Sequence, residues 1–209
     1  MTLTFYTNPM SRGRIVRWML EEVGQPYDVE ALDYASTMKG DAFRAVNPMM
    51  KVPAVVHDGR TVTETAAICA YLADAFPDAG LAPPPAERHD YYRWLFFAAG
   101  PIESAVLDKA RGIEVTDEQS RMAGFGTYDL LVSTLERAVA GKQFIAGDRF
   151  SAADVYVGSQ LMWGTQFGTL PKRDVFAAYL EPLMERPAYR RATELDDAMM
   201  QETMQQTPG

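Results

Sequence analysis

The first third of the chain alternates between strand-like and helix-like spacing of hydrophobic positions. Residues 3–6 form a short run rich in β-branched and aromatic side chains, and Asn8-Pro9 breaks it. Apolar residues at helical spacing follow over residues 15–23, and a short alternating segment follows at 27–31. Strand, helix, strand predicts a βαβ unit with a parallel pair of strands.

A hairpin and a further helix complete this pattern. Residues 52–63 contain two runs of β-branched side chains on either side of Asp58-Gly59, which is a strong signal for a two-residue turn. Residues 64–73 return to helical spacing, and the polar link before the hairpin leaves room for a short helix at 41–46. The expected order is β-α-β, an irregular link, and β-β-α.

The rest of the chain predicts helices alone. Residues 76–85 are rich in proline and lack periodicity, as in a linker between domains. We therefore expect an α/β domain at residues 1–78 and an all-helical domain at 86–209, whose last residues, 201–209, are expected to fray. The helices are predicted at 87–110, 117–140, 152–167, 174–186 and 188–200.

Composition narrows the class of protein. The net charge of −8 over 209 residues argues against binding to nucleic acid. The longest uncharged run, residues 155–171, includes Gly, Ser, Gln and Thr, so it predicts a buried helix and its exit and not a membrane span. Residues 1–5 lack the basic and apolar regions of a secretory signal, so we expect none there, and the single cysteine, Cys69, fits a reducing cytosol. We expect a cytoplasmic protein with small-molecule partners.

Ser11 is the first candidate for chemistry. It stands at or near the start of the predicted helix at 15–23, where unpaired backbone N–H groups and a partial positive charge favour an anion. Arg12 and Arg14 add two full charges. A thiolate would be stabilised there, although the same residue also fits a plain helix N-cap.

A second group of candidates surrounds the hairpin. Glu64-Thr65 opens the helix at 64–73, so the Thr65 hydroxyl and the first N–H groups could hold a carboxylate while Glu64 takes an ammonium. Such a pair would bind an α-amino acid head group. The alternative interpretation is that the two residues only cap the helix. Lys51 could hold a second carboxylate or be a solvated loop lysine. Val52-Pro53 opens a strand where the valine main chain could face a ligand.

Other conspicuous residues have structural interpretations. Ser151 and Asp154, flanked by Phe150 and Val155, have the form of a helix capping box with its hydrophobic staple. Cys69 lies among apolar residues of a predicted helix and is expected to be a small buried hydrophobe. The spacing of the two histidines predicts no metal site.

Three of these segments, in this order, resemble the cytosolic glutathione transferases. The segments are residues 47–54 (Asn-Pro-Met-Met-Lys-Val-Pro-Ala), residues 63–68 (Thr-Glu-Thr-Ala-Ala-Ile) and residues 150–154 (Phe-Ser-Ala-Ala-Asp). The resemblance covers nearly the whole chain and points to a bacterial-type member. It implies an α/β thioredoxin-like N-terminal domain, which binds glutathione, followed by an all-α helical C-terminal domain that completes the second-substrate site.

The resemblance also implies roles for individual residues. Pro53 would follow a cis bond, and the Val52 main chain would pair with the cysteinyl part of glutathione. Glu64 and Thr65 would hold the γ-glutamyl group, and Lys51 would approach the glycyl carboxylate.

The catalytic hydroxyl of the family follows the first strand, and here the sequence offers more than one candidate. We favour Ser11, a position typical of serine-type classes. Tyr6 and Asn8, or the main chain near them, remain alternatives. The absence of cysteine from residues 1–24 excludes a cysteine-type mechanism.

The function that follows is a glutathione transferase, in which Ser11 favours the glutathione thiolate for attack on an electrophilic small molecule. Glutathione is then the co-substrate, with no metal, and the family implies detoxification and a homodimer. A glutathione-dependent disulfide reductase or peroxidase, and a non-enzymatic glutathione-transferase-like binding module, are the alternatives that the sequence leaves open.

Overall fold

The computed structural model describes residues 1–206 and divides the chain into two compact units. Unit 1 contains residues 1–81 together with the chain from Arg186 onward, and unit 2 contains residues 82–185. These units differ from the predicted domains, 1–78 and 86–209, in that the last helix is grouped with unit 1. The domain boundaries at 1–78 and 86–209 therefore remain a prediction, whereas the two compact units are observed in the structure.

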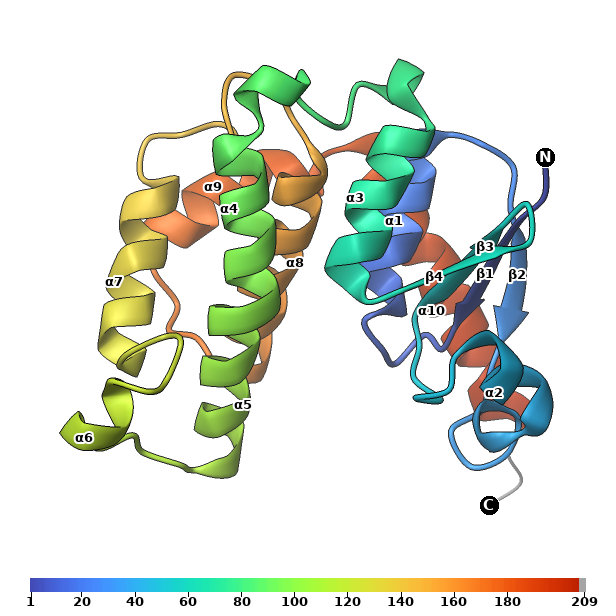
Figure 1. Ribbon diagram of the computed structural model, residues 1–209, viewed down its shortest axis with the longest axis horizontal. Helices are drawn as coiled ribbons and strands as arrows, with labels where there is room; N and C mark the ends of the chain where they lie inside the picture. Colours follow the sequence, from blue (N-terminus) through green and yellow to red (C-terminus); the bar gives the residue numbers. More distant parts are fainter. Residues whose placement is uncertain (207–209) are drawn as a thin grey trace. The chain divides into compact units, whose positions relative to one another are not determined.

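Unit 1 is built on a four-stranded mixed sheet with the order β2-β1-β3-β4 (Figure 1). The strands are β1 (Leu3–Thr7), β2 (Asp28–Ala31), β3 (Ala54–His57) and β4 (Arg60–Thr63). β1 pairs with β2 in parallel, as the βαβ pattern predicts, and the other two pairings are antiparallel. The predicted turn is present, because Asp58 and Gly59 both have positive φ, at 46° and 78°.

Helices cover both faces of this sheet. α1 (Gly13–Val23) and α3 (Thr65–Ala75) pack against each other and against the face that carries Leu3 and Phe5. On the opposite face, a 3-10 turn, η1 (Thr37–Lys39), and α2 (Asp41–Val46) close a small hydrophobic cluster with the sheet. This is the thioredoxin-like arrangement that the resemblance implies, and the prediction of the fold is confirmed.

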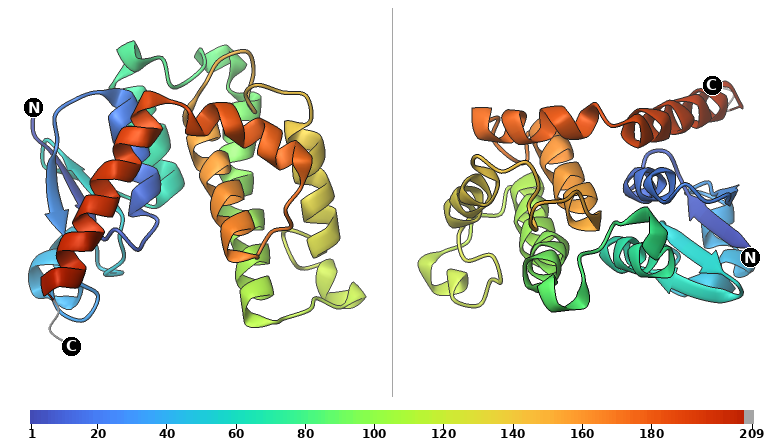
Figure 2. Two further views of the ribbon diagram at one scale, coloured as in Figure 1. Left: turned by 180° about the vertical axis from the view of Figure 1, so that it is seen from behind. Right: turned by 90° about the horizontal axis from the view of Figure 1, so that it is seen from above.

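α10 (Pro187–Gln206) runs alongside α1 (Figure 2). The ring of Tyr189 meets Trp18 edge to face, with centroids 5.0 Å apart. The buried guanidinium of Arg17 donates to Asp196 Oδ1 at 2.7 Å, and Arg186 bonds both carboxylate oxygens of Glu22. The helix is therefore longer than predicted and continues to Gln206. The expected fraying of residues 201–209 stays a prediction, and the last three of these residues lie outside the described chain.

Unit 2 is helical throughout its described elements. They are α4 (His89–Phe97), a π turn η4 (Ala98–Ile102), α5 (Glu103–Arg111), α6 (Asp117–Ser120), α7 (Tyr128–Val139), α8 (Ala152–Phe167) and α9 (Asp174–Met184). Every residue from Ala152 to Leu161 is buried, so α8 is the central helix of the unit. Its observed bounds equal the predicted ones.

The prediction of one helix at 117–140 is wrong. α6 ends at Ser120, and α7 begins only at Tyr128. Between them the chain turns through Gly126, whose φ of 68° suits glycine. Thr127 then caps α7 by accepting the N–H of Leu130 at 3.2 Å. Local glycine and capping chemistry therefore overrides the hydrophobic spacing that runs across the break.

Two 3-10 turns, η2 (Pro77–Ala79) and η3 (Pro85–Glu87), occupy the segment predicted as a linker. Each begins with a proline, which suits the first position of a helical turn because its missing N–H would be unpaired there. The segment is thus ordered in short turns and contains no longer helix or strand among its described residues.

Candidate functional site

The register of the sheet brings three candidate segments to one end of unit 1. Tyr6, near the end of β1, stands opposite Ala54 at the start of β3, and Ala54 stands opposite Thr63 at the end of β4. The loop into α1, the segment before β3 and the start of α3 therefore lie at the same edge. Ser11, Val52 and Glu64 belong to these three segments, so residues more than fifty positions apart in the sequence are placed at the same end of the strands.

Ser11 is half-buried directly before α1, which starts at Gly13. Its hydroxyl donates to the Asn8 carbonyl oxygen at 2.6 Å and accepts the N–H of Gly13 at 2.9 Å. A hydroxyl has one proton, so that proton points to Asn8 and must turn away before it can serve a ligand. The side chain closes the loop and satisfies one N–H of the first turn, and it remains within reach of the helix N-terminus.

The two alternative groups at this edge are more firmly tied to the fold. The Tyr6 ring packs against Phe43 of α2, with centroids 5.6 Å apart. The Asn8 amide is 4% exposed; it donates to the Leu32 carbonyl at 2.8 Å and accepts the N–H of Met10 at 2.9 Å. Both side chains therefore hold the loop and the α2 side of the sheet, which favours Ser11 among the three candidates.

The positive charge expected beside Ser11 is smaller than the sequence implies. Arg14 donates from Nε to the Pro9 carbonyl at 2.6 Å, and its Nη2 pairs with Asp197 of α10 at 2.7 Å. A carboxylate at that distance offsets much of the guanidinium charge. Arg12 is exposed at the same helix end. The contacts of α10 were missed from the sequence, because nothing local connects residues 14 and 197.

The segment that leads into β3 is shaped by Asn47. This buried amide donates to the Lys51 carbonyl at 2.8 Å and accepts the N–H of Met49 at 3.0 Å. Lys51 is exposed, and the bond between Val52 and Pro53 is cis, as the resemblance implies. The ladder of β3 begins only at Ala54, so Val52 stands ahead of it at the edge.

Glu64 and Thr65 form the start of α3. Glu64 is exposed and has a φ of 68°, which is uncommon for a residue other than glycine and carries a backbone cost of about 1–3 kcal/mol. Its carbonyl accepts the N–H of Ile68, and Thr65 is buried at the first helical position. The first turn contains no acidic side chain after Glu64, so its N–H groups suit an anionic ligand.

Cys69 and His57 have the structural surroundings that the sequence predicts or allows. Cys69 is fully buried in α3, and burial raises the pKa of its thiol to about 12. His57 Nδ1 lies 2.9 Å from the Tyr71 hydroxyl, and its ring also packs on Phe76. Neither group reaches the edge that carries Ser11.

Thr7 is the residue at this edge that sequence reasoning missed. It is the last residue of β1 and is fully buried, and its Oγ1 has no hydrogen-bond partner among the described residues. The alternation of Leu3 and Phe5, which both point toward α1, could have predicted that Thr7 points the same way.

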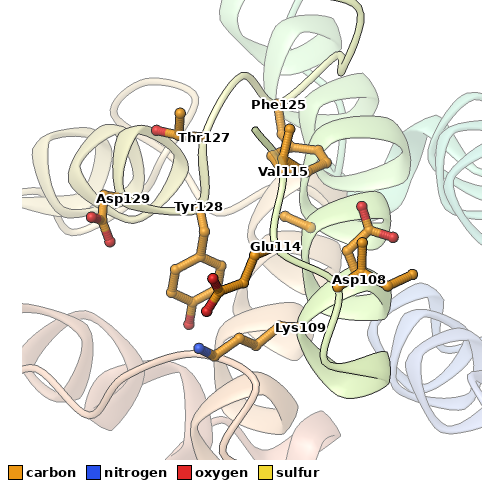
Figure 3. Close-up of a pocket in the computed structure, with 10 residues that line it drawn as sticks. Asp108, Lys109, Glu114, Val115, Phe125, Thr127, Tyr128 and Asp129 are labelled. Atoms are coloured by element: carbon orange, nitrogen blue, oxygen red, sulfur yellow. The ribbon is translucent and has the colours of Figure 1, made fainter. Parts of the chain in front are cut away.

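A separate pocket of about 280 Å³ lies within unit 2, between the end of α5 and the start of α7 (Figure 3). Lys109 places its ammonium 5.0 Å from the centre of the Tyr128 ring, and Tyr128 donates to the Thr169 carbonyl at 2.8 Å. Three carboxylates, those of Asp108, Glu114 and Asp129, outnumber the one ammonium in the lining, so the pocket disfavours an anion.

Neither a metal centre nor a membrane span emerges from residues 1–206. Within that range, no three His, Cys, Asp or Glu side chains are grouped so that they could hold a metal ion. None of the helices in the same range combines the length and the apolar character needed to cross a bilayer.

Comparisons with known proteins agree with this geometry. Residues 10–75 match the family model for the glutathione S-transferase N-terminal domain. Glutathione S-transferase GstA of Escherichia coli O157:H7 is 28% identical over 179 residues, which cover 83% of this chain and 88% of the relative.

Solved structures extend the likeness over more than nine-tenths of the chain. A glutathione transferase from Methylococcus capsulatus is 29% identical, with a TM-score of 0.78 and coverage of 94% of this chain and 100% of that one. A sphingomonad glutathione S-transferase complexed with glutathione is 28% identical, with a TM-score of 0.74 and coverage of 93% and 98%.

Proposed function

We infer that this chain is a cytosolic glutathione transferase of bacterial type that activates the thiol of glutathione as a thiolate. The observation that carries the site assignment is the sheet register. It gathers a helix N-terminus with a hydroxyl, a strand opening and a second helix N-terminus at one edge of unit 1. Glutathione has a thiol, a main chain and two charged ends to match them.

The glutathione thiol lies over the start of α1 in this proposal. A free thiol has a pKa near 8.5 and is mostly protonated at neutral pH. Ser11 turns its proton from the Asn8 carbonyl to the sulfur, and the N-terminus of α1 adds its partial positive charge. Lowering the thiol pKa by about two units requires roughly 2.7 kcal/mol, which a charge-assisted hydrogen bond and a helix dipole together supply.

The rest of the tripeptide is held by the other two segments. The γ-glutamyl ammonium pairs with the exposed Glu64 carboxylate, and its carboxylate meets the Thr65 hydroxyl and the N–H groups of α3. The Val52 main chain, ahead of the β3 ladder and of Pro53, pairs with the cysteinyl part. Lys51 is exposed next to it and pairs with the glycyl carboxylate.

The reaction does not require a general base that deprotonates Ser11. The thiol gives its proton to solvent, and the thiolate forms a bond to an electrophilic carbon while the leaving group departs with its bonding electrons. Ser11 stabilises charge and is not a nucleophile. The electrophile is a small molecule, and we assign the protein a cytoplasmic, detoxifying role that fits its single buried thiol.

We also propose a homodimer. α4 exposes Tyr92 at 41% and Phe96 at 71%, which is apolar surface that a partner would cover. A two-fold pair is the commonest closed assembly. Light scattering at micromolar concentration tests it: a mass about twice the 23.3 kDa of one chain supports the dimer, and a stable 23.3 kDa species contradicts it.

Retention on glutathione agarose and elution by free glutathione test the binding site. A conjugation assay with an aryl halide then tests the reaction, with a disulfide and a peroxide as parallel substrates. Conjugation supports the transferase. Reduction of the disulfide or peroxide without conjugation would make the chain a reductase or peroxidase, and no retention at all would favour the non-enzymatic glutathione-transferase-like binding module.

A further inference from the structure

Thr7 carries a buried hydroxyl that the fold itself does not use. The residue is 0% exposed, and Oγ1 finds no hydrogen-bond partner within residues 1–206. A buried hydroxyl without a partner lowers the stability of the folded protein, and valine would fill the same volume without that cost. Orphaned polar groups of this kind gather at functional sites, where another state of the site provides the missing partner.

The position of Thr7 connects it to Ser11. A methyl group added at Gly13 would lie 2.0 Å from Thr7 Oγ1 and 2.9 Å from Ser11 Oγ. The two hydroxyls therefore border the same small space under the first turn of α1, and only a glycine leaves that space open. Thr7 approaches from the sheet, and Ser11 approaches from the loop.

The hydrogen bonds of Ser11 leave room for one more donor. Its oxygen has two lone pairs and one proton; Gly13 N–H occupies one lone pair at 2.9 Å, and the proton goes to the Asn8 carbonyl at 2.6 Å. When the proton turns to a sulfur, the second lone pair remains free. Of the three described atoms nearest to a methyl group added at Gly13, Thr7 Oγ1 alone is a polar atom without a partner.

We propose that Thr7 is a positioning residue for the reaction: its hydroxyl donates to Ser11 Oγ once Ser11 donates to the glutathione sulfur. The relay runs from Thr7 to Ser11 to sulfur, and it rests on the function proposed above. A hydroxyl that accepts a hydrogen bond becomes a stronger donor, because bonds in a chain polarise one another at low dielectric. Thr7 thus lowers the pKa of the bound thiol without contacting the substrate.

Two substitutions separate the hydroxyl of Thr7 from its shape. Thr7→Val keeps the shape and removes the oxygen, whereas Thr7→Ser keeps the oxygen and removes a methyl group. The ultraviolet absorbance of the thiolate, titrated with pH on the complex of full-length protein and glutathione, reports the thiol pKa directly. Calorimetric affinity for glutathione and the thermal midpoint are measured on the same samples.

We expect Thr7→Val to raise the pKa of the bound thiol by about one unit, which is a tenfold loss of thiolate at any pH below both values. The glutathione Kd should change less than about twofold, and the thermal midpoint should stay level or rise because a buried unpaired oxygen is gone. Thr7→Ser should titrate like the wild type. A purely structural role predicts the opposite, namely a lower midpoint with no change in the thiol pKa.

The outcomes distinguish this proposal from the function on which it rests. A wild-type protein that fails to bind glutathione or to lower its thiol pKa overturns the proposed function, and the relay with it. A wild type with a lowered thiol pKa and a Thr7→Val variant with the same value overturns the relay alone. A thiol pKa that rises as much in Thr7→Ser as in Thr7→Val also overturns it, because Thr7→Ser still has the hydroxyl that the relay needs.

Discussion

Two helices in this protein begin beside a serine, and their starts are built in opposite ways. Before α8, Ser151 and Asp154 form the predicted capping box inside unit 2. Before α1, Ser11 accepts one N–H and donates to a loop carbonyl in unit 1. The first start is closed by its own side chains, and the second is left open toward the edge of the sheet.

At the start of α8, both oxygens of the Asp154 carboxylate accept hydrogen bonds from the chain itself. Asp154 is 0% exposed and accepts the N–H groups of Ile145 at 2.7 Å and Ser151 at 2.9 Å, as well as the hydroxyl of Tyr179 at 2.7 Å. Burial raises the pKa of Asp154, and these hydrogen bonds act against that rise. All of these hydrogen bonds are made with residues of the chain, so no ligand is needed to complete this helix start.

The start of α1 differs, because the hydrogen-bonding groups there are not all paired within the described chain. No acidic side chain occupies the first turn of α1, and Thr7 keeps an unpaired hydroxyl under Gly13. Such a start lacks one negative partner. The difference teaches that a serine at a helix N-terminus is structural when an acid of the chain completes the cap, and that it becomes a candidate for function when the acid is missing and a buried donor is left over.

The largest expected effect falls on the closed start. Asp154→Ala removes the acceptor for two backbone N–H groups and the Tyr179 hydroxyl, so it should lower the free energy of unfolding by about 3–5 kcal/mol. Urea denaturation followed by circular dichroism measures it. Asp148→Ala, an exposed acid in the same loop, is the matched control and should cost under about 0.5 kcal/mol. Equal losses in both variants would contradict the structural interpretation of Asp154.

The next effect concerns the start of α3. Glu64→Ala should weaken glutathione binding by about 1.5–3 kcal/mol, the range for a hydrogen bond to a charged group. Glu64→Gly is the control, because glycine relieves the positive φ of 68° while it also removes the carboxylate. Calorimetry should give both variants the same loss of affinity, with Glu64→Gly the more stable of the two. Wild-type affinity in either variant would exclude the assignment of the γ-glutamyl group.

The two serines provide the direct test of the comparison. Ser11→Ala should lower turnover with glutathione at least about tenfold, or about 1.4 kcal/mol, with little change in glutathione affinity. Ser151→Ala should leave turnover unchanged and cost about 1 kcal/mol of stability. Steady-state kinetics and thermal denaturation of both variants decide it. Unchanged turnover in Ser11→Ala together with a large loss in Tyr6→Phe would move the role to Tyr6.

The smallest expected effect is a pH dependence of the stability that comes from the buried Cys69 thiol, in contrast to the reactive thiol of glutathione. Burial raises the pKa of Cys69 to about 12, above the value of about 8.5 for an exposed thiol. The unfolded chain therefore loses this proton first, and the contribution of the thiol to stability is complete below pH 8.5 and falls as the pH rises toward 12.

Denaturation at two pH values measures this contribution. The stability of the wild type should fall by about 1 kcal/mol more than that of Cys69→Ala between pH 8.5 and about pH 9.5. Turnover with glutathione at pH 7 should be the same in both proteins. Parallel pH curves would show that Cys69 is not buried in the folded protein as described.

Signals that act over a few residues were sufficient to predict several elements. The hairpin turn at Asp58-Gly59, the capping box at Ser151 and the bounds of residues 152–167 all agree with the structure. In each of them a turn or a cap is decided by the chemistry of residues within about four positions. Breaks inside helical spacing were harder: the chain leaves the helix over residues 121–127, where glycine and a new cap compete with a continuing apolar pattern.

The sequence by itself was enough to predict the fold class, the resemblance to a family and the candidate residues, because these rest on local hydrophobic spacing and on short motifs. Only the tertiary structure decided how those residues are used. It pairs Arg14 with Asp197 and the buried Arg17 with Asp196, 179 positions away. It also leaves Thr7 without a partner under Gly13. Periodicity tells which face of a strand or helix is buried, but hydrogen bonds depend on which distant atoms arrive within about 3 Å, and this is fixed only when the elements pack.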